Sequence, residues 1–376
     1  MLGKIGKGFL VGLVALGICG LWAFNSVNAA DPPALARLTG AEKERVAKLI
    51  AGAKKEKELV AYSANWRPDV QQMILPVFRK EYGLSESDLK INILSIRTGD
   101  VVTRTTEELR AKVYKTDIIN TAPASWVNEL VGRGEIMAYN CAEYKYFSPL
   151  MADPKVGEAN PPYFISSEIY PVGLTYNPKL IKGEIAHWKD VLKPEYKGKI
   201  VITDPSNSFS MTEAYLAIRK VVGRSYFEEL GKMKPFIILS QSDLINKCVS
   251  GEFPIIVMST VSLAFRANER GAGLTMVLPT EGWAAPAYPA TILAHAPHPN
   301  AAKLFIDYFH GATCQDILMN YCGAAGGRRD LKSKHAYFPK PIEELKGAVE
   351  MDWRKVTNKD RDQAREEFRK LVKEVQ

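Results

Sequence analysis

The stretch LVAYSANWRPDV, residues 59–70, sets the pattern of the fold. Its first five residues form an apolar run of strand length, and Pro68 then stands at the first turn of a helical pattern. Gly83 ends that pattern, so the sequence predicts a strand at 59–63 followed by a helix at 68–82. The loop between them therefore lies at the carboxyl end of a strand and at the start of a helix.

The same alternation of short apolar runs and longer helical patterns continues along the chain. It is typical of the α/β class, in which mainly parallel sheets are flanked by crossover helices. Further strands are predicted at 91–96, 116–120, 169–176, 199–203, 236–239, 254–258, 275–279 and 290–294, and further helices at 42–58, 99–113, 124–131 and 355–376.

The length of 376 residues predicts two lobes, because domains usually hold about 100 to 200 residues. A stretch rich in proline and tyrosine at 139–163 interrupts the alternation, which then restarts. The strands at 275–279 and 290–294 have no obvious place in the second unit, so they are expected to return the chain to the first lobe and to create a hinge. The expected boundaries are 31–165 plus 280–312 for lobe 1, 166–279 plus 313–354 for lobe 2, and 355–376 for a C-terminal surface helix.

Residues 1–30 have the features of a cleaved secretory signal: two lysines, an apolar run at 9–24, and small residues before Ala30. A retained membrane anchor is the first alternative, but the run is shorter than the roughly 20 residues that span a bilayer. Lipid attachment at Cys19 is the second, but Ile18 stands where a lipoprotein signal places a small residue. The mature protein is therefore expected in the periplasm.

The distribution of charge and the spacing of histidines disfavour nucleic-acid and zinc binding, and the number of cysteines predicts disulfides. The formal net charge is +8, but lysines and arginines are dispersed among acidic residues, so no nucleic-acid-binding stripe is predicted. No histidine pair has the spacing of a zinc site. In an oxidising compartment an even number of cysteines favours disulfides, whose pairing stays open. The cysteines after residue 30 are Cys141, Cys248, Cys314 and Cys322.

Hydroxyl and amide side chains gather in three loops that precede predicted helices, at 63–68, 97–100 and 204–210. Ligands of open α/β sheets bind at the carboxyl ends of strands, where helix starts offer unpaired N–H donors. Simple capping of the helices, worth about 1 kcal/mol each, is the alternative for any one loop. Three such loops in two lobes predict a cleft for a polar, anionic group.

Several segments, in this order and spacing over roughly residues 57–320, resemble the type II periplasmic solute-binding proteins of ABC importers, in the branch that contains the ferric-ion binders. The segments are 59–63, 78–83, 116–118, 173–177, 188–199, 204–205, 251–252, 279–282 and 298–305. The resemblance implies a two-lobed α/β fold with hinge strands and a solute held between the lobes. It further implies a monomer that delivers its small-molecule solute to a membrane permease and its ATPase, without a cofactor.

Candidate ligand-binding residues follow from the loops and the resemblance. Arg97 is a candidate clamp for a carboxylate or phosphate, and Trp66 and Trp283 are candidates for stacking on the solute. An ordinary ion pair for Arg97 and buried packing for the tryptophans are the alternatives. The other candidates are Ser63, Asn65, Thr98, Gly99, Thr121, Tyr170, Tyr176, Ser206, Ser208, Ser259 and Thr260.

Two other functions have weaker support in the sequence. Ferric-ion members of the family place adjacent tyrosines after the strand that matches 255–258, but this chain has Ser259–Ser262 there and no Tyr-Tyr pair anywhere. A ferric site would need tyrosines from separate segments, namely Tyr144, Tyr146, Tyr170, Tyr176 or Tyr288. A secreted hydrolase is not favoured, because GxSxG, Walker and GxGxxG motifs are absent from the sequence and only Cys248 or His295 would remain as catalysts. The protein is therefore expected to be a binder of an anionic organic solute and not an enzyme.

Overall fold

A computed structural model describes residues 31–152, 160, 162–286, 288–352 and 355–375. The predicted secretory signal lies outside this range. Residues 32–376 form one compact unit by their contacts, so the predicted boundaries between lobes stay a prediction. In the described part of the chain, no helix is both long and apolar enough to cross a membrane.

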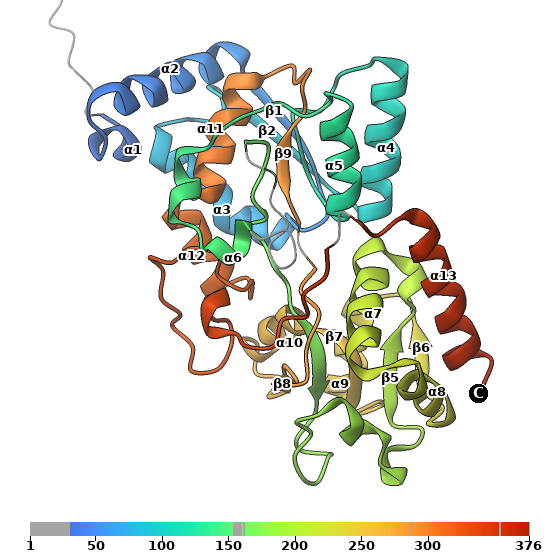
Figure 1. Cartoon of the computed structure of the whole chain (residues 1–376). Helices are drawn as coiled ribbons and strands as arrows, with labels where there is room; N and C mark the ends of the chain where they lie inside the picture. Colours follow the sequence, from blue (N-terminus) through green and yellow to red (C-terminus); the bar gives the residue numbers. More distant parts are fainter. Residues whose placement is uncertain (1–30, 153–159, 161, 287, 353–354, 376) are drawn as a thin grey trace, which may run out of the picture. The chain divides into compact units, whose positions relative to one another are not determined.

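The first sheet has four strands in the order β2-β1-β3-β9 (Figure 1). The strands β1 (Glu58–Ser63), β2 (Lys90–Ser95) and β3 (Ile118–Asn120) are parallel, and β9 (Ala290–Ile292) is antiparallel to β3. The helices of this part are α1 (Pro33–Ala36), α2 (Gly40–Glu56), α3 (Pro68–Tyr82), α4 (Thr98–Ala111), α5 (Ala124–Gly132), α6 (Pro149–Ala152), α11 (Pro299–His310) and α12 (Ala312–Asn320).

The second sheet has five strands in the order β6-β5-β7-β4-β8. The strands β5 (Ile200–Thr203), β6 (Phe236–Ile238) and β7 (Ile255–Thr260) are parallel, whereas β4 (Val172–Tyr176) is antiparallel to β7 and to β8 (Thr275–Val277). Its helices are α7 (Phe209–Val222), α8 (Arg224–Lys232), α9 (Gln241–Ser250), α10 (Val261–Asn268) and α13 (Asn358–Phe368), which runs into a π-helical turn at Arg369–Lys373. Short 3-10 turns occupy Ala142–Tyr146, Trp188–Leu192, Pro194–Tyr196, Pro205–Asn207 and Ile342–Glu344.

The position of β8 corrects the sequence-based expectation. Only β9 joins the first sheet, whereas β8 pairs with β4 at the edge of the second sheet. Gly173 explains this close pairing, because a Cβ atom there would stand 2.2 Å from the backbone oxygen of Val277. A glycine inside a strand often marks such a close backbone approach.

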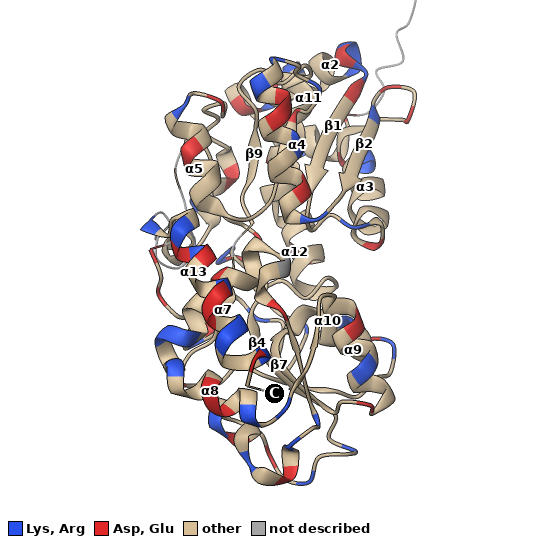
Figure 2. Ribbon diagram, turned by 90° about the vertical axis from the view of Figure 1, so that its right-hand side faces the viewer, with Lys and Arg blue, Asp and Glu red and all other residues tan. Residues whose placement is uncertain are grey.

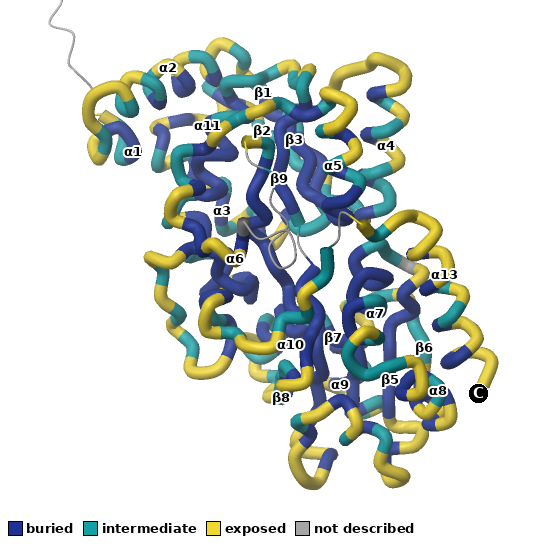
Figure 3. Tube along the Cα trace, in the orientation of Figure 1, coloured by how far each residue is buried: buried dark blue, intermediate teal, exposed yellow. Residues whose placement is uncertain are grey.

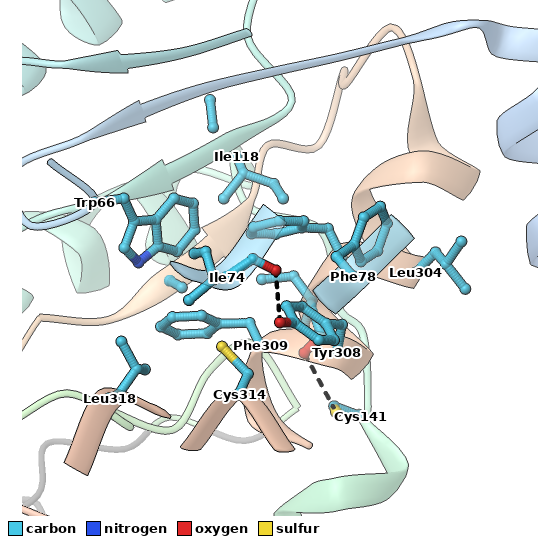
Figure 4. Packing of buried hydrophobic residues seen from close by; sticks show 14 of the residues in the cluster. Trp66, Ile74, Phe78, Ile118, Cys141, Leu304, Tyr308, Phe309, Cys314 and Leu318 are labelled. Carbon is cyan, nitrogen blue, oxygen red and sulfur yellow. Dashed lines mark hydrogen bonds between the residues drawn. The ribbon is translucent and has the colours of Figure 1, made fainter. Parts of the chain in front are cut away.

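Each sheet has its own hydrophobic core (Figure 3). In the first, Trp66 packs its ring 5.2 Å from that of Phe305 and 4.9 Å from that of Phe309, between α3 and α11 (Figure 4). In the second, Phe368 of α13 packs its ring edge-on against Tyr215, with the centroids 5.7 Å apart. The predicted C-terminal helix is therefore present and buries one of its faces.

The four cysteines are buried free thiols, so the predicted disulfides are not found. Cys314 lies inside α12 and Cys322 lies beyond its end. Cys141 and Cys248 belong to different hydrophobic clusters, where each thiol faces a backbone carbonyl. The thiols therefore serve as small core side chains.

Candidate functional site

A cavity of about 470 Å³ lies where the carboxyl ends of strands from both sheets meet. This volume falls within the range of sites for small organic ligands. Its walls combine arginines, hydroxyl and amide groups, two tyrosines and a few apolar side chains. The lining residues are Ala64, Asn65, Arg67, Arg97, Thr98, Tyr170, Thr203, Ser208, Ser210, Met211, Leu239, Ser240, Gln241, Thr260, Ser262, Leu263, Arg266 and Tyr288.

Helix N-termini converge on this cavity. In the described chain, five helices begin with an N-cap residue that lines it, namely Arg67 of α3, Arg97 of α4, Ser208 of α7, Ser240 of α9 and Thr260 of α10. The side chains of Ser208 and Ser240 cap their own helices. The N-cap side chains of α3, α4 and α10 make no such bond, although Asp69 and Asp100 stand in the first turns of α3 and α4. Each of these helix ends carries partial positive charge and favours an anion.

Arginine side chains add full positive charge to the cavity. Arg67, Arg97 and Arg266 line it, and the described lining includes no aspartate or glutamate. The side chain of Arg266 is only 13% exposed and lies 3.5 Å from the carboxylate of Asp69, which also pairs with Arg67 at 3.2 Å. Burial, and repulsion from Arg67, lower the pKa of the Arg266 guanidinium. A bound anion would relieve this repulsion.

Asp69 supplies only part of the countercharge for the two arginines. Burial acts to raise the pKa of its carboxyl group, but the hydrogen bond from Arg67 and the charges of Arg67 and Arg266 lower it overall. Asp69 is therefore ionised at neutral pH, yet it faces two guanidinium groups. Arg97 has its own partner, Asp100, at 3.1 Å, and its side chain is 75% exposed.

Two tyrosines form the floor of the cavity, and a buried glutamate, Glu168, lies behind one of them. The rings of Tyr170 and Tyr288 meet edge to face with centroids 5.9 Å apart. The hydroxyl of Tyr170 donates to Glu168 Oε1 at 3.0 Å, and Asn120 Nδ2 donates to Glu168 Oε2 at 2.9 Å. Burial raises the pKa of Glu168 to about 7. A carboxyl group that gains and loses a proton near neutral pH therefore lies directly behind Tyr170.

Ser63 shapes the loop that leads into α3. Its hydroxyl donates to Asn120 Oδ1 at 2.7 Å and accepts hydrogen bonds from the backbone N–H groups of Asn65 and Trp66. This arrangement aims Asn65 into the cavity, and the buried Nδ2 of Asn65 has no hydrogen-bond partner among the described residues. An unpaired buried donor costs about 1–3 kcal/mol.

Gln241 holds the end of β7 at the opposite wall. Its amide donates to Thr203 Oγ1 at 2.7 Å and to the carbonyl of Met258 at 3.4 Å, and its Oε1 accepts from the N–H of Thr260. Met258 has a φ of 58°, a left-handed conformation that is rare for a side chain of this kind. Strained residues of this type cluster at functional sites, and here the strain re-aims the end of β7.

The structure brings part of the predicted site together. The predicted residues that line the cavity are Asn65, Arg97, Thr98, Tyr170, Ser208 and Thr260. The predicted residues outside its lining are Ser63, Trp66, Gly99, Thr121, Tyr176, Ser206, Ser259 and Trp283.

Local geometry explains why several predicted residues lie elsewhere. Trp66 and Trp283 are fully buried, and Trp283 Nε1 donates to the carbonyl of Lys346. Ser259 is turned to the other face of β7 from Thr260, where its hydroxyl accepts from Thr175. Tyr176 stands at the far end of β4, in the second core.

Sequence reasoning misses two charged groups of the site. Arg67 lies inside one of the three predicted ligand loops, but it is not among the predicted ligands. Arg266 lies within α10, six residues after Thr260, where no loop signal reaches. One signal is available, because Arg266 is the only charged residue in the segment VSLAFRAN. Tyr288 is a sequence candidate only for a metal site. The remaining lining residues that the sequence does not predict are Ala64, Thr203, Ser210, Met211, Leu239, Ser240, Gln241, Ser262 and Leu263.

The described residues contain no group of three or more His, Cys, Asp or Glu side chains placed to hold a metal ion. Of the tyrosines considered for a ferric site, Tyr170 and Tyr288 line the cavity and Tyr144, Tyr146 and Tyr176 do not. The hydroxyl of Tyr170 is committed to Glu168. The described lining of the cavity offers hydrogen-bond donors and positive charge.

Comparison with known proteins gives one family. The family model described as bacterial extracellular solute-binding protein matches residues 141–358. No curated protein matches the sequence.

Similar solved structures have low sequence identity to the chain, so the likeness shows the fold alone. A substrate-binding protein of an ABC transporter from Agrobacterium tumefaciens has a TM-score of 0.69 at 13% identity, covering 85% of this chain and 96% of that one. AfuA from Actinobacillus pleuropneumoniae, solved with fructose-6-phosphate, has a TM-score of 0.67 at 20% identity, covering 84% and 98%. Iron-bound HitA from Pseudomonas aeruginosa has a TM-score of 0.63 at 18% identity, covering 85% and 99%.

Proposed function

The chain belongs to the bacterial extracellular solute-binding protein family, and from this premise we propose that it captures an anionic organic solute for an ABC importer. The fold is that of the type II periplasmic binding proteins. The family implies an extracytoplasmic location, a small-molecule solute, and a permease and ATPase as partners.

The main support for an anionic solute is that the charged side chain of Arg266 is largely buried beside Arg67. Two guanidinium groups face the same cavity, and three helices whose N-cap side chains make no cap bond begin at it. Guanidinium groups match the geometry of carboxylate and phosphate oxygens, to which they can bind in a bidentate manner. An anionic head group of the solute would take this position.

The rest of the cavity has room and chemistry for an organic body. Leu239, Leu263 and Met211 supply apolar contacts, and Tyr170 and Tyr288 offer aromatic surface. AfuA, which shares this fold, was solved with fructose-6-phosphate, a phosphorylated sugar. A solute that combines an anionic group with a small organic body fits the cavity best.

A ferric ion is the alternative that the structural neighbours raise, because iron-bound HitA has the same fold. The described lining has three arginines and no carboxylate, which opposes a bare trivalent cation electrostatically. Iron is therefore kept as an outcome of the experiment.

The mechanism follows from a solute that contacts groups from both sheets. Arg67 and Asn65 come from the first sheet region, and Arg266, Ser208 and Thr260 come from the second. A solute that bonds to both sides binds best when both sides face it, so it shifts the population toward the arrangement that encloses it. That arrangement would present the loaded surface to the permease.

The test is a thermal-shift panel on purified protein, followed by calorimetric titration of the compounds that stabilise it. The probes are inorganic phosphate, monophosphate esters, dicarboxylates, neutral sugars, organic amines and ferric nitrilotriacetate. Anionic organic compounds are expected to raise the melting temperature, since ligands that bind only the folded state stabilise it. Stabilisation by amines, neutral sugars or iron alone would contradict the proposal.

Arg266→Gln tests whether the charge of Arg266 contributes to solute binding, and Arg270→Gln is the matched control. Arg270 is exposed in the turn that follows α10 and does not line the cavity. Removal of a charged hydrogen-bond donor is expected to weaken binding about tenfold or more. Equal affinity of the two variants would exclude Arg266 from the site.

A further inference from the structure

We propose that Arg361, in the C-terminal helix α13, is a positioning residue that holds the two walls of the cavity together. Its guanidinium Nη2 donates to Glu213 of α7 at 2.9 Å and also to the hydroxyl of Ser125 in α5. Glu213 belongs to the second sheet region and Ser125 to the first. One side chain therefore bonds to both parts that form the cavity.

The bridge is buried. The side chains of Arg361 and Glu213 are each 2% exposed, and Ser125 is buried as well. Burial raises the pKa of Glu213, and the charge of Arg361 opposes that rise. A bond between buried charged groups is screened far less by water and salt than a surface pair. The bridge is thus suited to fix the position of α7 relative to α5.

Further contacts fasten α13 to the start of α7. Arg365 Nε donates to Thr212 Oγ1 at 3.2 Å, and both Arg361 and Arg365 lie over the ring of Phe209. Lys373 pairs with Asp204, in the loop before α7. In Figure 1 the dark-red α13 runs alongside α7. The C-terminal helix therefore binds the segment on which Ser208 and Ser210 line the cavity.

The other end of the bridge leads to the first wall. Ser125 lies in the first turn of α5, a few residues after Asn120 at the end of β3. Asn120 bonds to Glu168 behind Tyr170 and to Ser63, which shapes the Asn65 loop. A displacement of Ser125 is therefore expected to move both Tyr170 and the loop that contains Asn65.

Ser125→Ala isolates the bridge, because it removes the bond to the first region and leaves the Arg361–Glu213 pair intact. Removing Arg361 alone would leave a buried, unpaired carboxylate and endanger the fold. A second variant, Arg361→Met with Glu213→Leu, replaces the pair by apolar side chains of similar size. Glu367→Gln is the control, because Glu367 fastens α13 to Tyr215 and Arg219 within the second region only.

The experiment measures the distance between spin labels at Glu107→Cys in α4 and Ser225→Cys in α8, both exposed positions. The buried native thiols stay unlabelled in the folded protein. Without solute, Ser125→Ala and the double variant are expected to shift the distance distribution to longer and broader values, while Glu367→Gln keeps that of the parent. A parental distribution for Ser125→Ala, or an equal shift for Glu367→Gln, would overturn the proposal. Neither result depends on the identity of the solute.

Discussion

At the scale of single residues, Glu168 combines full burial with two hydrogen bonds to neutral groups, Tyr170 and Asn120. Its pKa of about 7 lies above the value of an unfolded glutamate. The folded protein therefore binds a proton between about pH 5 and 7 that the unfolded chain releases. The stabilisation is complete below the unfolded pKa and is lost as the pH rises through about 7.

We predict that Glu168→Gln abolishes the loss of stability that the parent protein shows as the pH rises toward 7. Between pH 5 and 8 the parent protein should lose up to about 3 kcal/mol of unfolding free energy relative to the variant. Urea denaturation of both proteins at several pH values measures the difference. His310 contributes an opposite slope at lower pH, because burial lowers its pKa to about 4, but it does so in both proteins. A constant difference across this range would show that Glu168 does not titrate there.

The cysteines give a second prediction at this scale. Four buried free thiols imply four reactive thiols per chain in denaturant and almost none in the folded protein, because burial raises the pKa of each thiol. Thiol titration with a chromogenic disulfide reagent, with and without guanidinium chloride, checks both numbers on protein exported to the periplasm. Two thiols or none in denaturant would indicate a disulfide instead.

At the scale of elements, periodicity predicts the nine strands of the two sheets within a few residues, but of the described helices it predicts only α2, α3, α4, α5 and α13. The helix at 68–82 and the strand at 91–96 correspond closely to α3 and β2. The partner of β8 could not be predicted, because strand pairing depends on Gly173 and on tertiary packing. Local signals likewise find the loops before α3, α4 and α7 but not Arg266, which reaches the cavity only through the packing of α10.

The link between β5 and β7 through Gln241 supplies the prediction at this scale. Gln241→Ala removes its bonds to Thr203, Met258 and Thr260, and should cost about 2 kcal/mol of unfolding free energy. Solute binding should weaken as well, since the N–H of Thr260 loses its hydrogen bond to Gln241 Oε1. Asn246→Ala, an exposed site on the same helix, is the control. Urea denaturation that gives equal stability for both variants would remove Gln241 from this role.

At the scale of the whole molecule, charge separates the site from the surface. Lys and Arg residues and Asp and Glu residues are interspersed along the ribbon in Figure 2, whereas the described lining of the cavity carries arginines without acidic residues. A net charge of +8 alone says little about ligands. The proposed anion preference therefore rests on the folded site and could not be derived from composition.

Solute capture should also compact the molecule. If the solute bonds to both walls, small-angle scattering should give a smaller radius of gyration for the loaded protein than for the empty one. Arg266→Gln at the same solute concentration should stay near the empty value. An unchanged radius of the parent at saturating solute would argue against closure.

The most direct measurement is native mass spectrometry of mature protein released from the periplasm, combined with metal analysis. The expected result is an organic adduct of defined mass that carries a carboxylate, phosphate or similar anionic group and is lost from Arg266→Gln. Stoichiometric iron, or a cationic or neutral adduct that Arg266→Gln retains, would contradict the central claim that this cavity binds an anionic organic solute.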